Sequence, residues 1–213
     1  RDLGDIFRMS LATTTLPGSA MLNICALLGK AGGGSRVIAV MPSIYRIEMR
    51  LAAGEIREWD ASVAHPYDSA MAKSSALRAH MIRAIDVEVA KSQGLEVAHC
   101  LWDLRKFYDS VRICVLQGKL RILKYPRPLA AMGFVAHKMP RILRVGPCVS
   151  KPVPATGRSM IAGCQQSCSW ARAMLHELIG ELTEAIPRNP CWVHVDDICQ
   201  VLKESEKGDV VRV

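Results

Sequence analysis

The fold of this chain is decided by the stretch Trp192-Val193-His194-Val195-Asp196-Asp197-Ile198-Cys199, in which two adjacent carboxylates stand between apolar, β-branched residues. The runs at residues 191–195 and 198–202 are separated by two residues, which is the spacing of a β-hairpin with Asp196 and Asp197 at its tip. Adjacent carboxylates repel each other, and burial would penalise each of them. They persist most easily when cations neutralise them, and magnesium prefers hard oxygen ligands of this kind.

A second acidic cluster lies in the stretch Leu101-Trp102-Asp103-Leu104-Arg105-Lys106-Phe107-Tyr108-Asp109. Residues 95–103 read as a buried strand that ends at Asp103. If this strand lies beside the hairpin, Asp103 meets Asp196 and Asp197, and three carboxylates can bridge two divalent ions about 3.5–4 Å apart. Such ions activate an attacking hydroxyl and stabilise a leaving pyrophosphate, so the pattern predicts a two-metal nucleotidyl-transfer site. The alternative is structural, because a lone Asp can cap a helix and Asp-Asp is an ordinary turn in a surface hairpin.

Four helices are expected around these strands. One begins at Pro42-Ser43, and a second covers residues 69–93, where apolar residues recur every four positions and Gly94 suits the C-terminal end. Residues 111–123 form a third helix and residues 167–186 a fourth. The recurring apolar residues of the second helix are Leu77, Met81, Ile85 and Val89. The core positions of the fourth are expected at Trp170, Met174, Leu178 and Leu182, with Ala171, Leu175 and Ile179 alongside. After residue 95 the order is strand, helix, helix, hairpin, which predicts an α+β fold.

The composition is that of a globular protein. Of the 213 residues, 50% are apolar and 23% are charged, which is enough to bury a core. The net charge is +8, and residues 104–172 contain 13 Lys or Arg and one acid, Asp109. A long basic stretch suits a polyanion such as nucleic acid, because each neutralised phosphate releases counterions. The same stretch also fits a solvated surface, and charge alone leaves both interpretations open.

The eight cysteines are scattered, and none forms a C-x-x-C pair. Free cysteine behaves as a small buried hydrophobe, so we expect an intracellular, reducing compartment (nucleus or cytoplasm) and not a secreted protein. A zinc site from Cys164, Cys168, Cys191 and His194 would fit no common ligand spacing.

No apolar run reaches the length of a membrane span, and no secretory signal is present. The chain begins with Arg1 rather than Met, so we expect a fragment of a longer protein.

Four blocks of sequence occur in an order known from one enzyme family. The first block is Leu28-Gly29-Lys30-Ala31-Gly32-Gly33-Gly34-Ser35-Arg36-Val37-Ile38-Ala39-Val40 with Pro42-Ser43-Ile44-Tyr45-Arg46, and the second is residues 103–111. The third and fourth are Gly157-Arg158-Ser159-Met160-Ile161-Ala162-Gly163-Cys164 and His194-Val195-Asp196-Asp197. With these blocks the chain resembles the reverse transcriptases of retroelements, especially the non-LTR retrotransposon and group II intron type. The blocks span residues 28–199, nearly the whole chain.

The resemblance implies a polymerase right hand. A fingers-like region is expected at residues 1–94 and a palm-like region, with an antiparallel sheet and packed helices, at residues 95–213, while the thumb is absent. The implied activity is that of an RNA-directed DNA polymerase, which adds deoxynucleotides to a primer 3′ end by a two-metal mechanism. The implied partners are an RNA template, a DNA primer and deoxynucleoside triphosphates, with no membrane. The implied cofactor is Mg²⁺ as two ions, with Mn²⁺ as an alternative.

The resemblance also assigns the metal-binding residues. Asp103, Asp196 and Asp197 would be the catalytic acids and would hold the metal ions. The carbonyl of Leu104 would be an extra metal ligand. Asp109 ranks below these acids, because it suits a cap of the helix that follows.

Four further residues would contact the incoming nucleotide. Lys30 and Arg36 would grip the triphosphate, since Arg binds phosphate through two hydrogen bonds and Lys acts as a point charge. Tyr108 would lie under the sugar and exclude a 2′-hydroxyl. Gly163 would let the backbone approach the templating base pair. Each residue also has an ordinary structural interpretation: solvated charge for Lys30 and Arg36, core packing for Tyr108, and a turn for Gly163.

Three positions depart from the family pattern: Ala162 stands where Gln is usual, His194 replaces an aromatic residue, and Val37 replaces a proline. Two other functions therefore stay open. One is a truncated or decayed palm that binds nucleic acid without catalysis. The other is an RNA-dependent RNA polymerase, which shares the Asp-Asp hairpin, although the glycine-rich block and Tyr108 argue against it. A phosphate-loop or dinucleotide-binding enzyme is excluded, because residues 29–36 lack the glycine spacing of either motif.

Overall fold

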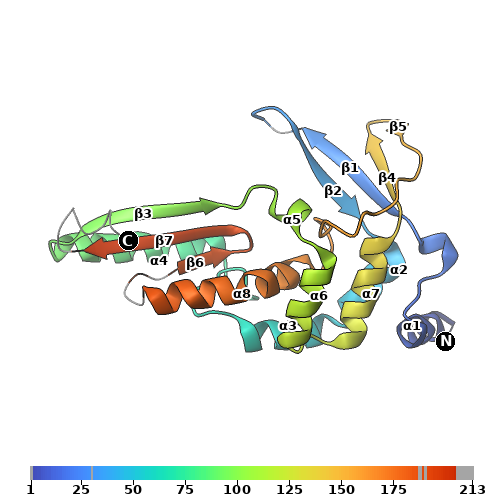
Figure 1. Ribbon diagram of the computed structural model, residues 1–213, viewed down its shortest axis with the longest axis horizontal. Helices are drawn as coiled ribbons and strands as arrows, with labels where there is room; N and C mark the ends of the chain where they lie inside the picture. The colour runs from blue at the N-terminus through green and yellow to red at the C-terminus, as the bar shows by residue number, and fades with distance from the viewer. Residues whose placement is uncertain (1, 30, 187–188, 190, 205–213) are drawn as a thin grey trace. The chain divides into compact units, whose positions relative to one another are not determined.

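The computed structural model describes residues 2–29, 31–186, 189 and 191–204, and it combines helices with two sheets in the α+β architecture that the sequence predicts (Figure 1). These residues form two compact units, each assembled from two separate segments. Unit 1 contains residues 2–59 and 106–173, and unit 2 contains residues 60–105 and those from 174 onward. No helix in the described part of the chain combines the length and apolarity needed to cross a membrane.

Unit 1 contains a four-stranded sheet in the order β2-β1-β4-β5, beside a set of packed helices. Strand β1 pairs antiparallel with β2 and parallel with β4, and β4 pairs antiparallel with β5. The predicted glycine-rich turn closes the β1–β2 hairpin, where Gly33 and Gly34 take φ angles of 88° and 81° that favour glycine. The elements of this unit are α1 (Asp2–Thr13), the 3-10 turn η1 (Gly18–Ala20), β1 (Asn23–Gly29), β2 (Ser35–Val40), α2 (Ser43–Leu51), most of α3 (Ala53–Val63), α5 (Phe107–Ser110), α6 (Ile113–Ile122), α7 (Arg127–Lys138), β4 (Arg141–Val145), β5 (Cys148–Val149) and the start of α8 (Ser167–Ala185).

A buried glutamine ties the helices of unit 1 together. The side-chain oxygen of Gln166 accepts a hydrogen bond of 2.7 Å from the Tyr125 hydroxyl. Its amide nitrogen donates to the Tyr45 hydroxyl at 2.9 Å and to the Leu129 carbonyl at 3.1 Å. Gln166 is fully buried, so these bonds replace those that water would make in the unfolded chain. The network fixes α2, α7 and the turn before α7 around the start of α8.

Close packing of α7 against α8 isolates a histidine from water. His137 is 2% exposed, its ring centre lies 4.7 Å from that of Trp170, and its Nδ1 donates to the Gly133 carbonyl at 2.8 Å. A Cβ atom at Gly133 would lie 2.5 Å from the Trp170 ring, so a larger residue would displace the indole. Burial lowers the pKa of His137 to about 4; the hydrogen bond to Gly133 opposes this shift, and the positive charge of Arg141 adds to it.

We predict that His137 makes the fold sensitive to acid. Its pKa is about 4 in the folded chain against an ordinary value of 6.5, so the unfolded chain binds the proton first as the pH falls. The free energy of unfolding should therefore decline between pH 6.5 and about 4, by up to about 3 kcal/mol. Urea unfolding measured across this range tests the slope, and His137→Gln should flatten it. The same pH slope in both proteins would contradict the assignment.

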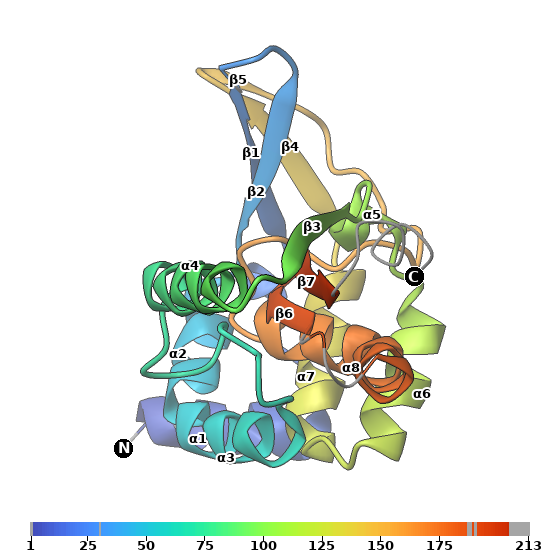
Figure 2. The same cartoon turned by 90° about the vertical axis from the view of Figure 1, so that its left-hand side faces the viewer.

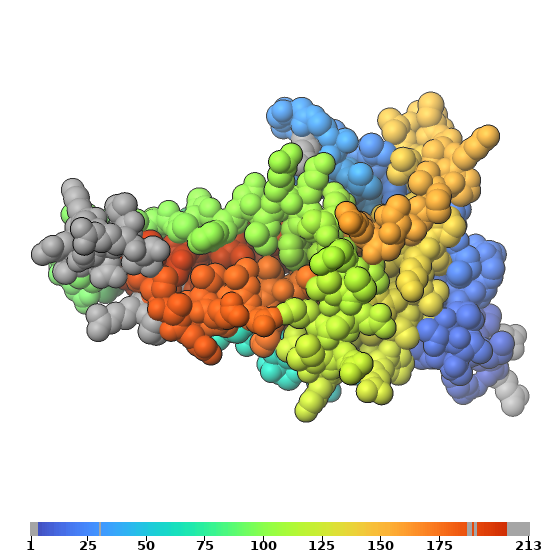
Figure 3. All heavy atoms as spheres, in the orientation of Figure 1, coloured from blue at the N-terminus to red at the C-terminus, as the bar shows by residue number. Residues whose placement is uncertain are grey.

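Unit 2 is a three-stranded antiparallel sheet in the order β3-β7-β6 with a helix on each side. Helix α4 lies on one side and the C-terminal half of α8 on the other (Figure 2). On the face drawn in Figure 3, atoms of β7 show between those of β3 and α8. Trp192, Cys199 and Val201 of the sheet pack with Ala79 and Val87 of α4. The named elements are α4 (Ala76–Ser92), β3 (Glu96–Asp103), β6 (Cys191–His194) and β7 (Asp197–Glu204).

Helix α4 presents small residues to the sheet and large apolar residues outward. Ala79, Val87 and Ala90 are buried, and an ion pair of 2.6 Å joins Asp86 to Lys203 of β7. The outward residues are those that recur every four positions in the sequence, and their exposed fractions are 49% to 70%. They are Leu77, Met81, Ile85 and Val89. Their periodicity identifies one face of the helix correctly, but this face is not the one that packs.

Two sequence predictions about the helices need correction. Helix α4 begins at Ala76 rather than at residue 69, because the Ser75 hydroxyl caps it by accepting a hydrogen bond of 3.1 Å from the Arg78 amide. In α8 the predicted core position Leu178 is 42% exposed, whereas Leu175 and Ile179, which the spacing places beside the core positions, are buried. The buried face of this half of α8 therefore runs along Leu175 and Ile179 rather than along Leu178.

Candidate active site

The antiparallel pairing of β3 with β7 sets two aspartates directly opposite each other. The ladder runs without a break from the pair Glu96 and Glu204 to the pair Asp103 and Asp197. Asp103 is the last residue of β3, and Asp197 is the first residue of β7. The structure therefore brings the two acidic clusters, which are far apart in the sequence, to one end of one sheet.

Both carboxylates belong to the side of the sheet that faces α4. Side chains alternate along a strand, so Asp197 lies on the same face as Cys199 and Val201, which pack with α4. Asp103 and His194 are the register partners of Asp197 and share this face. Like charges directly opposite on neighbouring strands destabilise a sheet. A cation held between them would remove this cost.

A hollow of about 330 Å³ is lined by these carboxylates and by the first two turns of α4. Ala76 and Ala79 contribute short side chains, which leave the space open. Arg83 is the cation of the lining and is half-buried. Sequence reasoning missed Arg83. Its spacing from residues 76 and 79 places all three on one helical face, but nothing in the sequence indicates that this face meets the acids.

The β6–β7 hairpin turns one residue earlier than the sequence predicted. Its turn residues are Val195 and Asp196, because His194 pairs with Asp197 in the ladder. The prediction that Asp197 lies at the tip is therefore wrong. Val195 has a φ of 61°, a left-handed conformation that is strained for a β-branched residue. Strain of this kind persists where the surrounding structure enforces it, and it often marks functional sites.

A serine fixes the histidine beside the acids. The Ser69 hydroxyl donates to the Val193 carbonyl at 2.9 Å, which uses its only proton. The contact of 3.2 Å between the Ser69 oxygen and Nδ1 of His194 therefore has the ring N–H as its donor. The hydrogen bond to Ser69 gives His194 a structural role, and we assign it no catalytic role.

Two acids, Asp103 and Asp197, offer oxygen ligands in the hollow, and no third acid of the described residues joins them there. Within the residues that the structure describes, no group of three or more His, Cys, Asp or Glu side chains is arranged to hold a metal ion. Asp196 is in the turn and does not line the hollow that Asp103 and Asp197 share. Magnesium is commonly held by one or two carboxylates together with waters and substrate phosphates, so the pair fits such an ion.

The remaining candidate residues are divided between the two units. Arg36 is exposed in β2 of unit 1. Tyr108 is half-buried in α5 of the same unit, where its ring stands edge-on to that of Phe107 with 5.6 Å between ring centres. Leu104 directly follows β3 in unit 2 and is half-buried. Lys30 lies outside the described residues.

Gly163 lies in a segment of unit 1 that is pressed against β2. Its φ is 105°, and a Cβ atom there would lie 2.5 Å from the Ala39 carbonyl oxygen. The Ala39 amide donates to the Ala162 carbonyl at 3.0 Å, and the Met160 amide donates to the Tyr108 carbonyl at 2.8 Å. Packing in unit 1 alone therefore requires glycine at this position.

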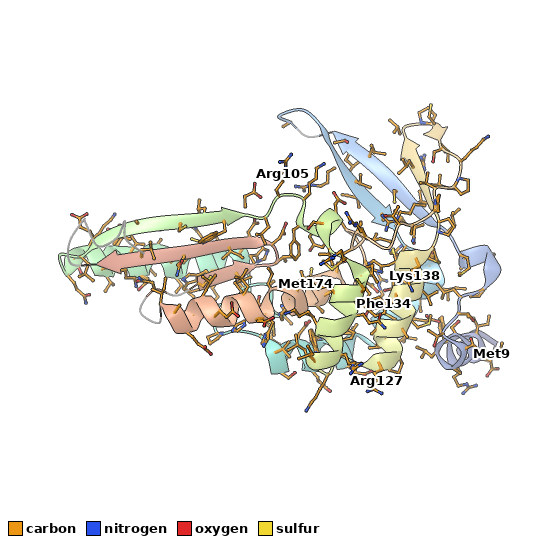
Figure 4. The ribbon with its side chains drawn as sticks, viewed as in Figure 1. Met9, Arg105, Arg127, Phe134, Lys138 and Met174 are labelled. Carbon is orange, nitrogen blue, oxygen red and sulfur yellow. The ribbon has the colours of Figure 1, made fainter. Side chains whose placement is uncertain are left out.

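A second hollow, of about 490 Å³, lies between α6 and α7 in unit 1 and is rimmed by cations. Arg121, Lys124 and Arg127 line it, its floor is apolar, and none of its lining residues is acidic. Figure 4 shows Arg127 at one end of α7 and Lys138 at the other, with Phe134 between them. The basic stretch seen in the sequence therefore supplies cations to one concave surface.

Comparison with solved structures finds telomerases. Apo telomerase from Candida tropicalis, truncated from the C-terminal domain, has 13% sequence identity and a TM-score of 0.56, over 98% of this chain and 49% of its own. Telomerase from Candida albicans with a TWJ fragment of telomeric RNA has 13% identity and a TM-score of 0.56, over 98% and 42%. Another apo telomerase from Candida tropicalis has 12% identity and a TM-score of 0.59, over 99% and 45%. The chain thus spans slightly less than half the length of these proteins.

At these identities the likeness shows the fold alone, and this fold is reverse-transcriptase-like. It agrees with the family resemblance at that level and gives no support to the non-LTR or group II intron type. No family model and no curated protein sequence matches the chain.

We predict that Gly163→Ala destabilises the chain more than Gly157→Ala does. Both glycines have positive φ angles, 105° and 72°, so alanine is strained at either position. Only at Gly163 would the new Cβ meet the Ala39 carbonyl oxygen, which adds an overpacking cost. We expect a loss of about 2–4 kcal/mol for Gly163→Ala and about 1 kcal/mol for Gly157→Ala in urea unfolding. Equal losses would show that the segment and β2 are not in close contact.

We also predict that the opposed aspartates respond to magnesium. Without divalent ions, Asp103→Asn should raise the free energy of unfolding by up to about 1 kcal/mol, because it removes one of two facing charges. Added Mg²⁺ should raise the melting temperature of the parent more than that of the variant, which has lost a ligand. Thermal unfolding in EDTA and in Mg²⁺ measures both effects.

The control for this experiment is Glu58→Gln, which removes an exposed carboxylate of α3 that has no partner across a strand, and it should respond to Mg²⁺ as the parent does. A parent whose melting temperature ignores Mg²⁺ would contradict cation binding by the pair.

Proposed function

We propose that this chain carries out template-directed nucleotidyl transfer as a reverse-transcriptase-like polymerase unit with Asp103 and Asp197 in its active site. The observation that carries the proposal is the direct pairing of these two acids across β3 and β7 at the edge of an open hollow. Two carboxylates that face each other across neighbouring strands lower the free energy of unfolding. An arrangement that destabilises the fold and has no structural role is commonly a functional site. The reverse-transcriptase-like fold supports the same reaction class by analogy.

In this proposal Asp103, Asp196 and Asp197 hold two Mg²⁺ ions, with the Leu104 carbonyl as an extra ligand and Mn²⁺ as an alternative ion. When bound, divalent cations neutralise charge at the phosphorus and favour ionisation of the attacking hydroxyl. The register of β3 and β7 sets the separation of Asp103 from Asp197. Asp196 would join them from the adjoining strained turn.

The proposed substrates are deoxynucleoside triphosphates, an RNA template and a DNA primer. Lys30 and Arg36 would bind the triphosphate, and the exposed position of Arg36 in β2 leaves it accessible. Tyr108 would exclude a 2′-hydroxyl, and Gly163 would let the backbone approach the templating pair.

Origin and compartment are also part of the proposal. The four sequence blocks favour a retrotransposon or group II intron origin. The eight cysteines are free, which suits an intracellular, reducing compartment.

Primer extension on an RNA template with Mg²⁺ tests the proposal. The parent should incorporate deoxynucleotides. Asp103→Asn and Asp196→Ala should each lower the rate at least about 100-fold, because each removes a proposed metal ligand that stabilises the transition state. Glu96→Gln should keep the parent rate, since it lies at the far end of the strand. Equal rates in the parent and both aspartate variants would remove these acids from the active site.

The second candidate function is nucleic-acid binding without catalysis. The cation-rimmed hollow between α6 and α7 favours it, because clustered Arg and Lys bind phosphates without regard to sequence. Labelled RNA that binds the parent more weakly as salt rises, and that binds still more weakly to Arg121→Gln/Arg127→Gln, would support this function. It replaces the first candidate if the parent then shows no Mg²⁺-dependent incorporation.

A further inference from the structure

We propose that the hollow at the acid end of unit 2 binds the phosphate groups of a magnesium–nucleoside triphosphate complex, with Arg83 of α4 as a phosphate ligand. This inference rests on the proposed function and adds a binding residue to it. It requires that Arg83 face the acids, that the guanidinium be free to bind, and that the charge of the hollow suit a phosphate.

The packing of α4 directs Arg83 toward the sheet. Ala79 and Val87 are each four residues from Arg83, one turn away on the same helical face, and both are buried against the sheet. The ion pair between Asp86 and Lys203 fixes the same face further along the helix. Figure 2 shows α4 running beside the sheet at this side. Arg83 is accordingly half-buried and lines the hollow.

The guanidinium of Arg83 is not paired with the carboxylates of Asp103 and Asp197. Arg83, Asp103 and Asp197 line one hollow, yet within the described residues Arg83 makes no ion pair with either acid. Its N–H donors are therefore available to a ligand. A planar guanidinium binds phosphate through two parallel hydrogen bonds, which fixes the orientation of the phosphate as well as its position.

The charges of the hollow make phosphate binding depend on the metal. Two carboxylates and one guanidinium give a formal charge of about −1, which repels a phosphate. One divalent cation on Asp103 and Asp197 changes this to about +1, which attracts a phosphate. Metal and nucleotide should therefore bind together, and the metal-free hollow should bind neither phosphate nor nucleotide.

The wall of the hollow contains an unsatisfied donor. Trp192 lines the hollow and is 8% exposed, and its buried indole N–H has no acceptor in the part of the chain that the structure describes. Buried donors nearly always have a partner, so this N–H is a polar group that the described fold leaves unsatisfied in the wall. Trp102 lines the same hollow and is 46% exposed. The two indoles supply a spectroscopic signal at the proposed site.

Tryptophan fluorescence during titration with dATP, in Mg²⁺ or in EDTA, tests the inference directly. The parent should respond in Mg²⁺ and not in EDTA, and magnesium tripolyphosphate should compete, because the phosphates are what the hollow recognises. Arg83→Gln should weaken binding at least about tenfold, and Arg83→Lys should restore part of it. Arg78→Gln is the matched control, since Arg78 is an exposed arginine of the same helix outside the hollow.

A steric variant keeps the test decisive if loss of Arg83 alters folding. Ala76→Leu places a larger side chain in the lining of the hollow and should weaken binding of magnesium–dATP about tenfold or more. Ala84→Leu adds the same volume at an exposed position of α4 outside the lining and should bind as the parent does. Circular dichroism verifies that each variant retains its fold.

The outcomes separate this inference from the proposed function. Unchanged affinity in Arg83→Gln and in Ala76→Leu, with binding lost in Asp103→Asn, overturns the role of the hollow and leaves the active-site acids in place. A parent that shows no Mg²⁺-dependent response to dATP overturns the inference in every case. Primer extension by the parent then decides the proposed function on its own.

Discussion

The pairing of β3 with β7 is the constraint on which the candidate site depends. Its register sets Asp103 against Asp197, and a slip by one residue would turn one of these side chains to the opposite face of the sheet. The apolar residues further along the strands fix the register, because Cys199 and Val201 must meet α4. The packed part of the sheet thereby stabilises an arrangement of like charges at its end that would be unfavourable in isolation.

Helix α4 gives this site its shape. Its contact face carries the small residues Ala79 and Ala90, so the helix approaches the sheet closely, and Ala76 at its start leaves a hollow open beside the acids. The same orientation turns Leu77, Met81 and Ile85 to solvent, which is an unusual placement for large apolar side chains. The position of Arg83 follows from this orientation and from nothing in its immediate sequence.

Fold and chemistry rest on different observations in this protein. The likeness to telomerases at 12–13% identity concerns the path of the backbone, and folds of one kind host many functions. The argument for catalysis comes instead from the paired carboxylates, the strained turn at Val195 and the hollow between sheet and helix. Gly163 is an example of the difference. The resemblance assigned this residue to the templating base pair, but its packing against Ala39 already accounts for a glycine at this position.

The sequence by itself determined the strands, the hairpin and the acids, because alternating apolar residues and turn spacing are local patterns. It located the ends of β3, β6 and β7 to within about two residues, but β3, which the sequence predicted to be buried, is largely exposed. It missed α7, which follows Pro126 and has Pro128 in its first turn, since proline reads as a break although it is tolerated at a helix start. Only the tertiary structure decided which face of α4 packs and therefore that Arg83 lines the same hollow as the acids. Helical periodicity shows which residues share a face, but the partner surface decides which face is buried.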